Sequence, residues 1–214
     1  MKKYLLFALA LLVLLPACAS RGEPMEFVRP QPLADAQRFS AADLSFDGIT
    51  IAASTLDDAL AKWGEPQQRT EVAEGQGYVL HYGFGQVYFN NTRGGDFIMN
   101  GITLLAEGQV GPRDIKIGDD YGKLIAAFPD ELHQELTGGL VHLYAAGTDL
   151  NEDGTTRYIE PICYFSIDQY GTGGLSANDY VVENGQNRMI YYSAFFTNGK
   201  VSQITLNYGV PPIE

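Results

Sequence analysis

The chain is poor in positive charge and in cysteine. Its 214 residues include 14 Lys and Arg against 26 Asp and Glu, which gives a formal net charge of −12, and only 2 cysteines. Such an acidic surface repels phosphate backbones and anionic lipid headgroups, which argues against nucleic-acid binding and against electrostatic binding to membranes. We expect the acidity to keep the protein soluble outside a cell, or else to favour a partner with a basic patch.

Sequence motifs for catalysis are also missing. The histidines at positions 81, 133 and 142 are scattered and lack the spacing of metal ligands, and no Gly-x-Ser-x-Gly motif is present. The glycine-rich segment 171–174 opens no predicted helix, so it does not predict a phosphate-binding loop. Cys163 lies among apolar neighbours and has the pattern of a small core residue, not of a reactive thiol. We therefore predict that the protein is not an enzyme.

The chain lacks a hydrophobic run long enough to cross a bilayer. The apolar segment Tyr4–Leu15 follows two lysines and is shorter than the about 20 residues that a membrane span needs, so it fits a signal peptide. It ends in Leu15-Pro16-Ala17-Cys18, which resembles the lipobox of bacterial lipoproteins. We predict a lipoprotein signal peptide at 1–17 and lipid attachment at Cys18, which would anchor the protein to the extracytoplasmic face of a bacterial membrane. An ordinary secretory signal, cleaved near the same alanine, is the alternative.

Residues 18–43 are predicted to be a flexible tether. Three prolines and several polar residues occur in this segment, and its few apolar residues show no helical or strand period. The folded part is therefore expected to begin near Leu44.

The clearest helix signal spans residues 54–66. Ser54 or Thr55 can cap its start, and Asp57 or Asp58 three positions later completes a capping box. A glycine at the C-cap position and a proline two residues later end it. The apolar stripe of this helix consists of Leu56, Ala59, Leu60 and Trp63.

A second copy of this helix signal follows in the other half of the chain. Asp119 and Asp120 provide the cap, and Pro129 ends the helix. Two copies of one signal predict two structural units, which we place at 44–108 and 109–214, the second with insertions. The second apolar stripe consists of Tyr121, Leu124, Ile125 and Phe128.

Strand signals follow each helix. The segment 97–104 predicts a hairpin with Asn100-Gly101 at its turn, and the segment 188–208 predicts another with Asn198-Gly199 at its turn. A two-residue turn pairs Thr197 with Lys200 and Phe196 with Val201, so one face of the second hairpin is the expected core and the other is half-exposed, although both could be ordinary sheet surface. The expected core face holds Met189, Tyr191, Ser193, Phe195, Ser202, Ile204, Leu206 and Tyr208, and the expected half-exposed face holds Ile190, Tyr192, Ala194, Phe196, Val201, Gln203, Thr205 and Asn207.

The order of these motifs resembles a known family. Residues 48–51, the capped helix ending in Trp63-Gly64-Glu65-Pro66, the aromatic strands and the closing Asn-Gly hairpin are similar to the tandem-repeat fold of the beta-lactamase inhibitor protein and of SmpA/BamE-like lipoproteins. The resemblance implies an α+β fold of two tandem repeats, each a helical layer on an antiparallel sheet. It also implies that an exposed sheet face binds another protein, and it places the partner-binding residues Tyr82, Phe84, Tyr192 and Phe196 on or near that face.

The segment 149–160 matches the pattern of a calcium-binding loop. Oxygen-bearing side chains stand at positions 1, 3 and 5, a glycine at position 6 and a glutamate at position 12, so that alternate residues can converge on one cation. The alternative is a hairpin loop whose Asn, Asp and Gly only satisfy turn geometry. The predicted calcium ligands are Asp149, Asn151, Asp153, Thr155 and Glu160.

Together these patterns predict a non-catalytic binding module of the cell envelope. We expect it to bind a protein or an envelope component through an aromatic sheet face, without nucleic acid. The alternative is a calcium-stiffened protein that binds a small molecule or a glycan in a tyrosine-rich groove.

Overall fold

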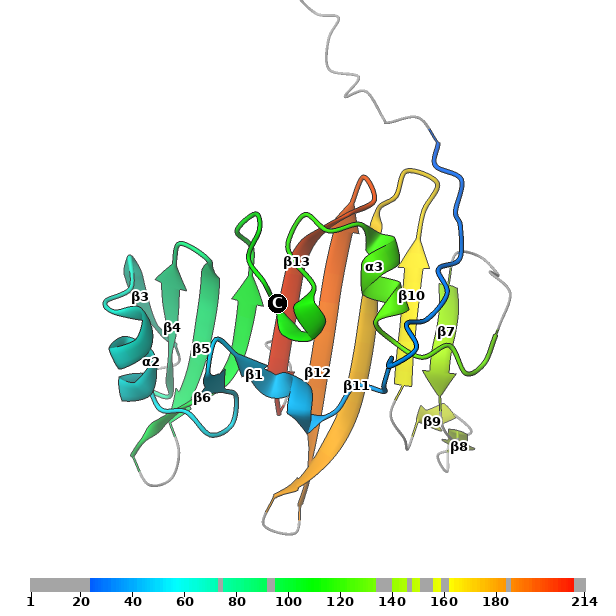
Figure 1. Cartoon of the computed structure of the whole chain (residues 1–214). Coiled ribbons are helices and arrows are strands. Elements are labelled where there is room, and N and C mark those ends of the chain that lie inside the picture. Colours follow the sequence, from blue (N-terminus) through cyan, green and yellow to red (C-terminus); the bar gives the residue numbers. More distant parts are fainter. Residues whose placement is uncertain are drawn as a thin grey trace, which may run out of the picture.

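Nine of the strands form one continuous antiparallel sheet. The computed structural model describes residues 24–72, 75–91, 95–133, 140–145, 148–150, 156–158, 162–183 and 186–209. The sheet comprises β3 (Gln68–Val72), β4 (Gly77–Tyr82), β5 (Gly85–Asn91), β6 (Phe97–Leu104), β7 (Leu140–Ala145), β10 (Ile162–Ile167), β11 (Gly173–Glu183), β12 (Gln186–Thr197) and β13 (Lys200–Tyr208). Their spatial order is β3-β4-β5-β6-β13-β12-β11-β10-β7 (Figure 1).

The remaining elements are short. Two small two-stranded sheets pair β1 (Ser45–Phe46) with β2 (Ile49–Thr50), and β8 (Thr148–Leu150) with β9 (Thr156–Tyr158). The helical elements are η1 (Ala41–Leu44), α2 (Leu56–Trp63), η2 (Pro112–Asp114) and α3 (Tyr121–Ala126). None of the described helices is both long and apolar enough to cross a membrane.

The predicted fold class, an α+β fold of two helix-plus-sheet repeats, is wrong. The described chain is mostly antiparallel β-sheet, and α2 and α3 have only 8 and 6 residues. Strand β6 pairs directly with β13, with Leu104 opposite Ile204 and Ile102 opposite Leu206. In two separate repeats, β6 and β13 would each be an edge strand with unpaired backbone N–H and C=O groups. Here these groups pair with each other, so the strands before and after η2 belong to one sheet.

Both helix predictions are confirmed in position. Thr55 caps α2, and Thr55 and Asp58 form the predicted capping box through reciprocal side-chain and backbone hydrogen bonds. Gly64 follows α2 at φ 73°, where a residue with a Cβ would be strained. Asp120 is the N-cap residue of α3, although its side chain makes no capping hydrogen bond. Local sequence therefore set the start of both helices and, through Gly64, the end of α2.

The predicted hairpin at 97–104 is wrong, because this segment is the single strand β6. The Asn-Gly pair does not turn the chain. Instead, the β5–β6 register shifts between Tyr88 and Phe89, and Asn100 is the extra residue opposite them. Gly101 lies so close to β13 that a Cβ there would be 2.3 Å from Asn207 Oδ1. The glycine therefore serves close strand packing, not a turn. The second predicted turn is confirmed, with Asn198 at φ 52° and Gly199 at φ 73° between β12 and β13.

A bulge in that last hairpin reverses part of the predicted face assignment. The register shifts between Phe195 and Phe196, so that Phe196 pairs with Val201 but Phe195 pairs with Gln203. Ser202 is the extra residue, and its hydroxyl donates to the Phe195 carbonyl at 3.3 Å. One extra residue moves all later side chains of a strand to the other face.

The core face of β12 is consequently the one expected to be half-exposed. Its side chains Ile190, Tyr192, Ala194 and Phe196 are buried, whereas Phe195 is 49% exposed. In β13, beyond the bulge, Ile204 and Leu206 are buried as predicted, and Val201 is buried as well.

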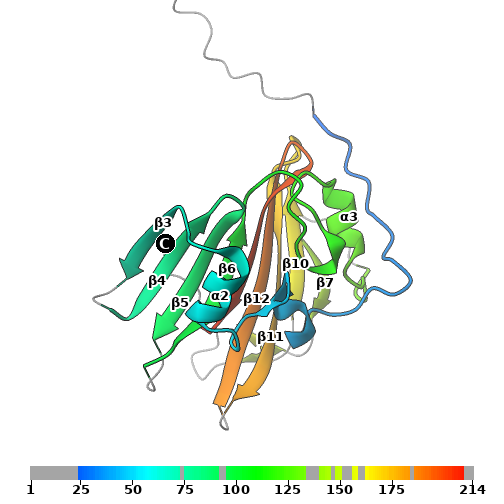
Figure 2. The ribbon, with the colours of Figure 1, turned by 60° about the vertical axis from the view of Figure 1, so that its left-hand side comes forward.

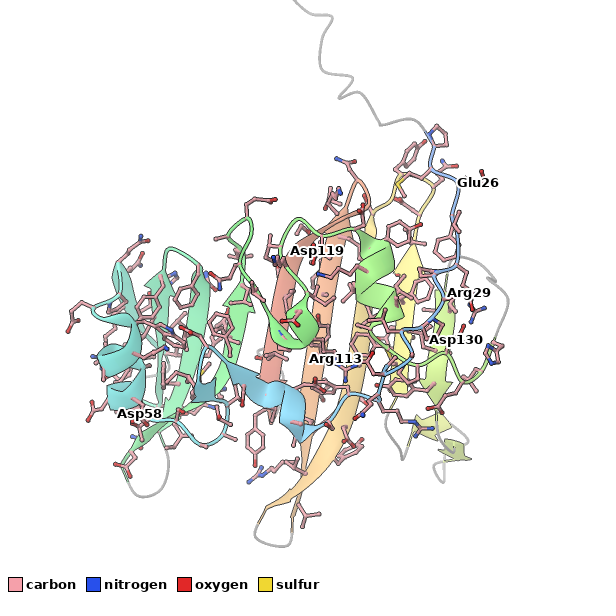
Figure 3. All side chains as sticks on the ribbon, viewed as in Figure 1. Glu26, Arg29, Asp58, Arg113, Asp119 and Asp130 are labelled. Atoms are coloured by element: carbon pink, nitrogen blue, oxygen red, sulfur yellow. The ribbon has the colours of Figure 1, made fainter. Side chains whose placement is uncertain are left out.

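Both helices and the N-terminal segment cover one face of the sheet (Figures 1 and 2). Residues 24–43, which belong to the predicted flexible tether, pack on this face of the sheet. Phe27 stacks on Phe165 of β10 with centroids 5.8 Å apart, and Arg29 forms an ion pair with Asp130 (Figure 3). Phe39 is 1% exposed, and its N–H donates to the Tyr144 hydroxyl at 2.9 Å. This segment completes the core on the helix-covered face, hereafter the inner face.

Arg113 joins the N-terminal segment to the end of α3. Its guanidinium lies 4.3 Å from the centroid of the Phe128 ring, and its side chain is 12% exposed (Figure 3). All five N–H donors of a guanidinium have acceptors here. These are both Asp43 carboxylate oxygens at 2.9 and 2.8 Å and the carbonyls of Gln37, Arg38 and Ala127 at 2.7, 3.0 and 2.7 Å.

Replacing Arg113 should therefore destabilise the whole domain. We expect Arg113→Ala to lower the free energy of unfolding by about 3 kcal/mol, because it leaves a mostly buried carboxylate and three carbonyls without their donor. As a control, Lys200→Ala removes an exposed ion pair with Asp120 and should cost less than about 1 kcal/mol. Urea unfolding of both variants measures the difference. Equal stabilities of the two variants would contradict the role assigned to Arg113.

Candidate binding surface

Two of the four predicted partner-binding residues are buried in the core. Tyr192 is 0% and Phe196 1% exposed, and both lie on the inner face. The Tyr192 ring packs against the rings of Phe39 and Phe128 at 5.9 and 5.5 Å. Burial raises the pKa of the Tyr192 hydroxyl. These two side chains are therefore core residues and cannot touch a partner on an exposed sheet face.

The other two, Tyr82 and Phe84, hold α2 on the sheet. Their rings stack on each other at 5.1 Å, and both contact the Trp63 ring, at 5.8 and 5.2 Å. The Tyr82 hydroxyl donates to the carbonyl of Gly64 at 3.1 Å, and burial raises its pKa. Phe46 packs on Trp63 and Phe84 from β1. The predicted residues are thus brought together in pairs, but on the inner face.

The opposite face of the sheet, hereafter the outer face, carries no described helix (Figures 1 and 2). Cross-strand pairing places one residue from each strand in a single row across the whole sheet. Every member of this central row has a hydroxyl, amide or imidazole side chain. In spatial order the row is Gln68, His81, Gln86, Thr103, Thr205, Ser193, Ser176, Tyr164 and His142.

The rows on either side have the same character. None of the residues in the three rows is Asp, Glu, Lys or Arg, in a chain with a net charge of −12. One flanking row runs from β3 to β11 and the other from β13 to β7. The first consists of Thr70, Val79, Tyr88, Gly101, Asn207, Tyr191 and Asn178, and the second of Gln203, Phe195, Gly174, Ser166 and Leu140.

Hydrogen bonds between neighbouring side chains hold the middle of the outer face in order. Thr103 and Thr205 share a hydrogen bond of 3.2 Å across β6 and β13, and the Gln203 amide donates to Thr205 at 3.1 Å. The Tyr88 hydroxyl donates to the Gln86 amide oxygen at 2.7 Å. Side chains that already bond one another lose less conformational freedom when a partner binds.

Similar contacts occur towards both ends of the central row. On β3 and β4, the Gln68 amide donates to Thr70 at 3.3 Å, and Thr70 is 3.4 Å from His81 Nε2. At the other end, the His142 and Tyr164 rings lie 5.8 Å apart. Such contacts therefore occur at both ends of the central row as well as in its middle.

Exposed aromatic rings of the outer face lie on strands β10 and β12. Phe195 is 49% and Tyr164 37% exposed. Val182 is 75% exposed on the part of the β11–β12 hairpin that extends beyond the last residue pairs with β10 and β13. Exposed aromatic rings among neutral hydrogen-bonding groups are typical of protein-binding surfaces, whose centres are depleted of charge.

The remaining predicted sites lie outside the described residues or in the core. Cys18 and most of the predicted calcium loop, 151–155 and 159–160, are not described, and Asp149 is described only as a backbone position in β8 opposite Arg157. Among the described residues, no three His, Cys, Asp or Glu side chains are grouped to hold a metal ion. The lipid anchor and the calcium loop stay predictions. Cys163 is buried, as expected, and burial raises the pKa of its thiol.

No protein-family model, curated protein or solved structure matches this chain. The family resemblance drawn from the sequence stays a prediction, apart from the fold class corrected above.

Sequence reasoning placed Gln203, Thr205 and Asn207 on the half-exposed face, where they lie, but it missed the rest of the outer face because it followed aromatic residues. A second signal was present: the segments 77–91, 97–104, 162–167 and 201–208 contain no Asp, Glu, Lys or Arg. Strands without charge on either face predict a sheet that is covered on one side and neutral on the other. Which residues form the neutral side depended on the bulges.

The hydrogen bond between Trp63 and Asp47 gives a pH-dependent optical signal. Trp63 Nε1 donates to Asp47 Oδ2 at 3.0 Å, and this bond, with the nearby Lys62, holds the pKa of Asp47 below its ordinary value of 3.8. The bond therefore contributes fully to stability at pH values above the ordinary pKa of Asp47. This contribution is lost as the pH falls through the lower pKa of the folded state. We expect the fluorescence of this single tryptophan to change below pH 3.8.

The variant Asp47→Asn should abolish that fluorescence change while leaving the fold intact. Asp58→Asn is the control, since the pKa of Asp58 is also lowered, by hydrogen bonds from Thr55, but Asp58 is not bonded to the indole. A transition of the same size in Asp47→Asn would show that another group reports to Trp63.

Proposed function

We propose that the chain is a non-catalytic binding module that recognises a protein partner through the outer face of its sheet. In this proposal the lipid at Cys18 anchors the module to the extracytoplasmic face of a bacterial membrane. The observation that carries the proposal is the set of three side-chain rows that are free of charged residues in a strongly acidic chain.

Solubility alone gives no reason for such a face. Surfaces that only face water usually mix charges of both signs over their whole area. Protein interfaces, in contrast, lose charged residues at their centre, where an unpaired charge would be stripped of water. Here the neutral side chains are gathered on one face, and we infer that a partner covers it.

The size of the outer face fits a specific complex. With strands about 4.8 Å apart and alternate residues about 6.7 Å apart, the three rows cover roughly 700 Å². A standard interface buries about 800 Å² on each partner. The partner is expected to offer a neutral polar surface, because a basic or acidic patch would lose its hydration without gaining an ion pair.

The test introduces one charge of either sign into the face. The variants Phe195→Glu and Phe195→Lys should both lower the affinity for the partner at least about tenfold. A factor of ten corresponds to about 1.4 kcal/mol, and a desolvated unpaired charge costs more than that. The partner is first isolated with the wild-type full-length chain from the cells that make it. Its affinity for the variants is then measured with purified components.

The matched control is Leu33→Glu. Leu33 is an exposed apolar side chain too, at 54%, but it lies on the N-terminal segment that packs on the inner face. We expect this variant to bind like wild type, and wild-type binding to change little between about 0.05 and 0.5 M salt, where screening weakens exposed ion pairs. If neither charge at position 195 weakened binding, or if Leu33→Glu weakened it equally, the outer face would not be the interface; if only one sign weakened binding, the surface of the partner would not be neutral.

A hollow at one end of the outer face supports a second candidate, the binding of a small uncharged ligand such as a sugar. The hollow has a volume of about 360 Å³ and is lined by Gln68, His81 and Gln86 of the central row, with Gln67 and Tyr82 beside them. Amide and imidazole groups can bond hydroxyl groups without charge. Binding of a neutral glycan that is lost in Gln86→Ala, with unchanged protein binding, would favour this candidate.

A further inference from the structure

The two edge strands of the sheet, β7 and β3, differ in whether another described segment hydrogen-bonds to their outer backbone groups. At the β7 edge, the carbonyl of Leu143 accepts hydrogen bonds from the N–H groups of Glu131 and Leu132, at 2.8 and 3.2 Å. The segment that follows α3 thus shields this edge. At the other edge β3 pairs with β4 alone, and no described segment pairs with the backbone edge of β3 that points away from β4 (Figure 1). An unpaired edge strand is a template for another strand.

Strand β3 is short and carries two charged side chains, but it lacks three other common protections of an edge, namely a lysine, a proline and a bulge. All five of its side chains are exposed, and its register with β4 runs from Gln68 to Val72 without a bulge. Proteins commonly protect an edge with lysines, a proline or a bulge within the strand. Here the only charged residues are Arg69 and Glu71, of opposite sign and two positions apart, so both lie on the same side of the strand.

Opposite charges at this spacing match a second copy of the same strand. If two β3 strands pair antiparallel about Thr70, Arg69 of each copy lies directly opposite Glu71 of the other, and the two Thr70 side chains face each other. Both pairs are favourable across neighbouring strands. A parallel pairing in register would instead place like charges together. The sequence of this edge is thus self-complementary in one orientation only.

We propose that β3 is a homotypic docking edge, at which a second copy of this chain adds its own β3 in antiparallel orientation. The two sheets then form one sheet in which the flanking rows that end at Thr70 continue into one another, and Gln68, at the end of each central row, lies opposite Val72 of the other copy. The interface is a short one of five residues per strand, so the dimer is weak and depends on local concentration.

The test uses charge reversal at the two positions. In Glu71→Arg both charges of the strand become positive, and in Arg69→Glu both become negative, so each variant repels its own copy. A mixture of the two restores both opposite-charge pairs, as does the double variant R69E/E71R. Two differently tagged full-length copies are co-expressed and solubilised, and the fraction of the second tag recovered with the first is measured.

The expected result is recovery for wild type, for the double variant and for the mixture of the two single variants. For each single variant paired with itself, the recovered fraction of the second tag should fall about tenfold or more, because two attractive cross-strand pairs become repulsive. Lys200→Glu, an exposed charge reversal far from β3, should recover like wild type. Arg69→Glu also loses the stacking of the guanidinium on Tyr78 at 3.6 Å, so circular dichroism confirms its fold.

Two results would overturn the proposal. One is a wild-type chain whose two tagged copies do not co-purify. The other is recovery that is the same for the single variants paired with themselves and for their mixture, since only β3–β3 pairing depends on that combination. Neither result bears on the outer face as a partner site, because the Phe195 variants test that surface separately.

Discussion

The architecture depends on a guanidinium that holds three segments together. Arg113 bonds Asp43, the backbone of residues 37–38 and the end of α3, and it stacks on Phe128. Arg113 and Asp114 both have left-handed backbone conformations, with φ 61° and 56°, which are unfavourable for side chains with a Cβ. The five hydrogen bonds offset that cost. They also fix residues 37–43 on the inner face, and no described helix covers the outer face.

The two faces of the sheet use neutral residues for different purposes. On the inner face, rings such as Phe39, Phe128 and Tyr192 exclude water and hold the helices. On the outer face, amides and hydroxyls bond along the rows while Phe195 and Tyr164 stay exposed. The three rows of the outer face contain no charged residue, although other positions of the same strands do, such as Asp179 in β11 and Lys200 in β13. An acidic chain can in this way keep a neutral surface for a partner and still repel nonspecific contacts over the rest of its surface.

Local sequence was sufficient wherever a few neighbouring residues decide the outcome. The capping box of Thr55 and Asp58 and the Asn198-Gly199 turn could be predicted because their hydrogen bonds and φ angles involve residues close in the chain. The same reasoning failed at Asn100-Gly101, whose local turn preference is overridden by pairing with β5 and β13. It failed again at Tyr192 and Phe196, because a single extra residue, Ser202, changes the face on which each side chain lies.

The sequence by itself determined where the helices begin, where the last hairpin turns, and that several strands carry no charge, because these depend on short-range backbone geometry and on composition. Only the tertiary structure decided that the strands form one sheet, which side of it the N-terminal segment covers, and which edge is left open. Those outcomes come from contacts between residues far apart in the chain, such as Arg113 with Asp43 or β6 with β13. No local pattern specifies them, because their free energy exists only once the segments have met.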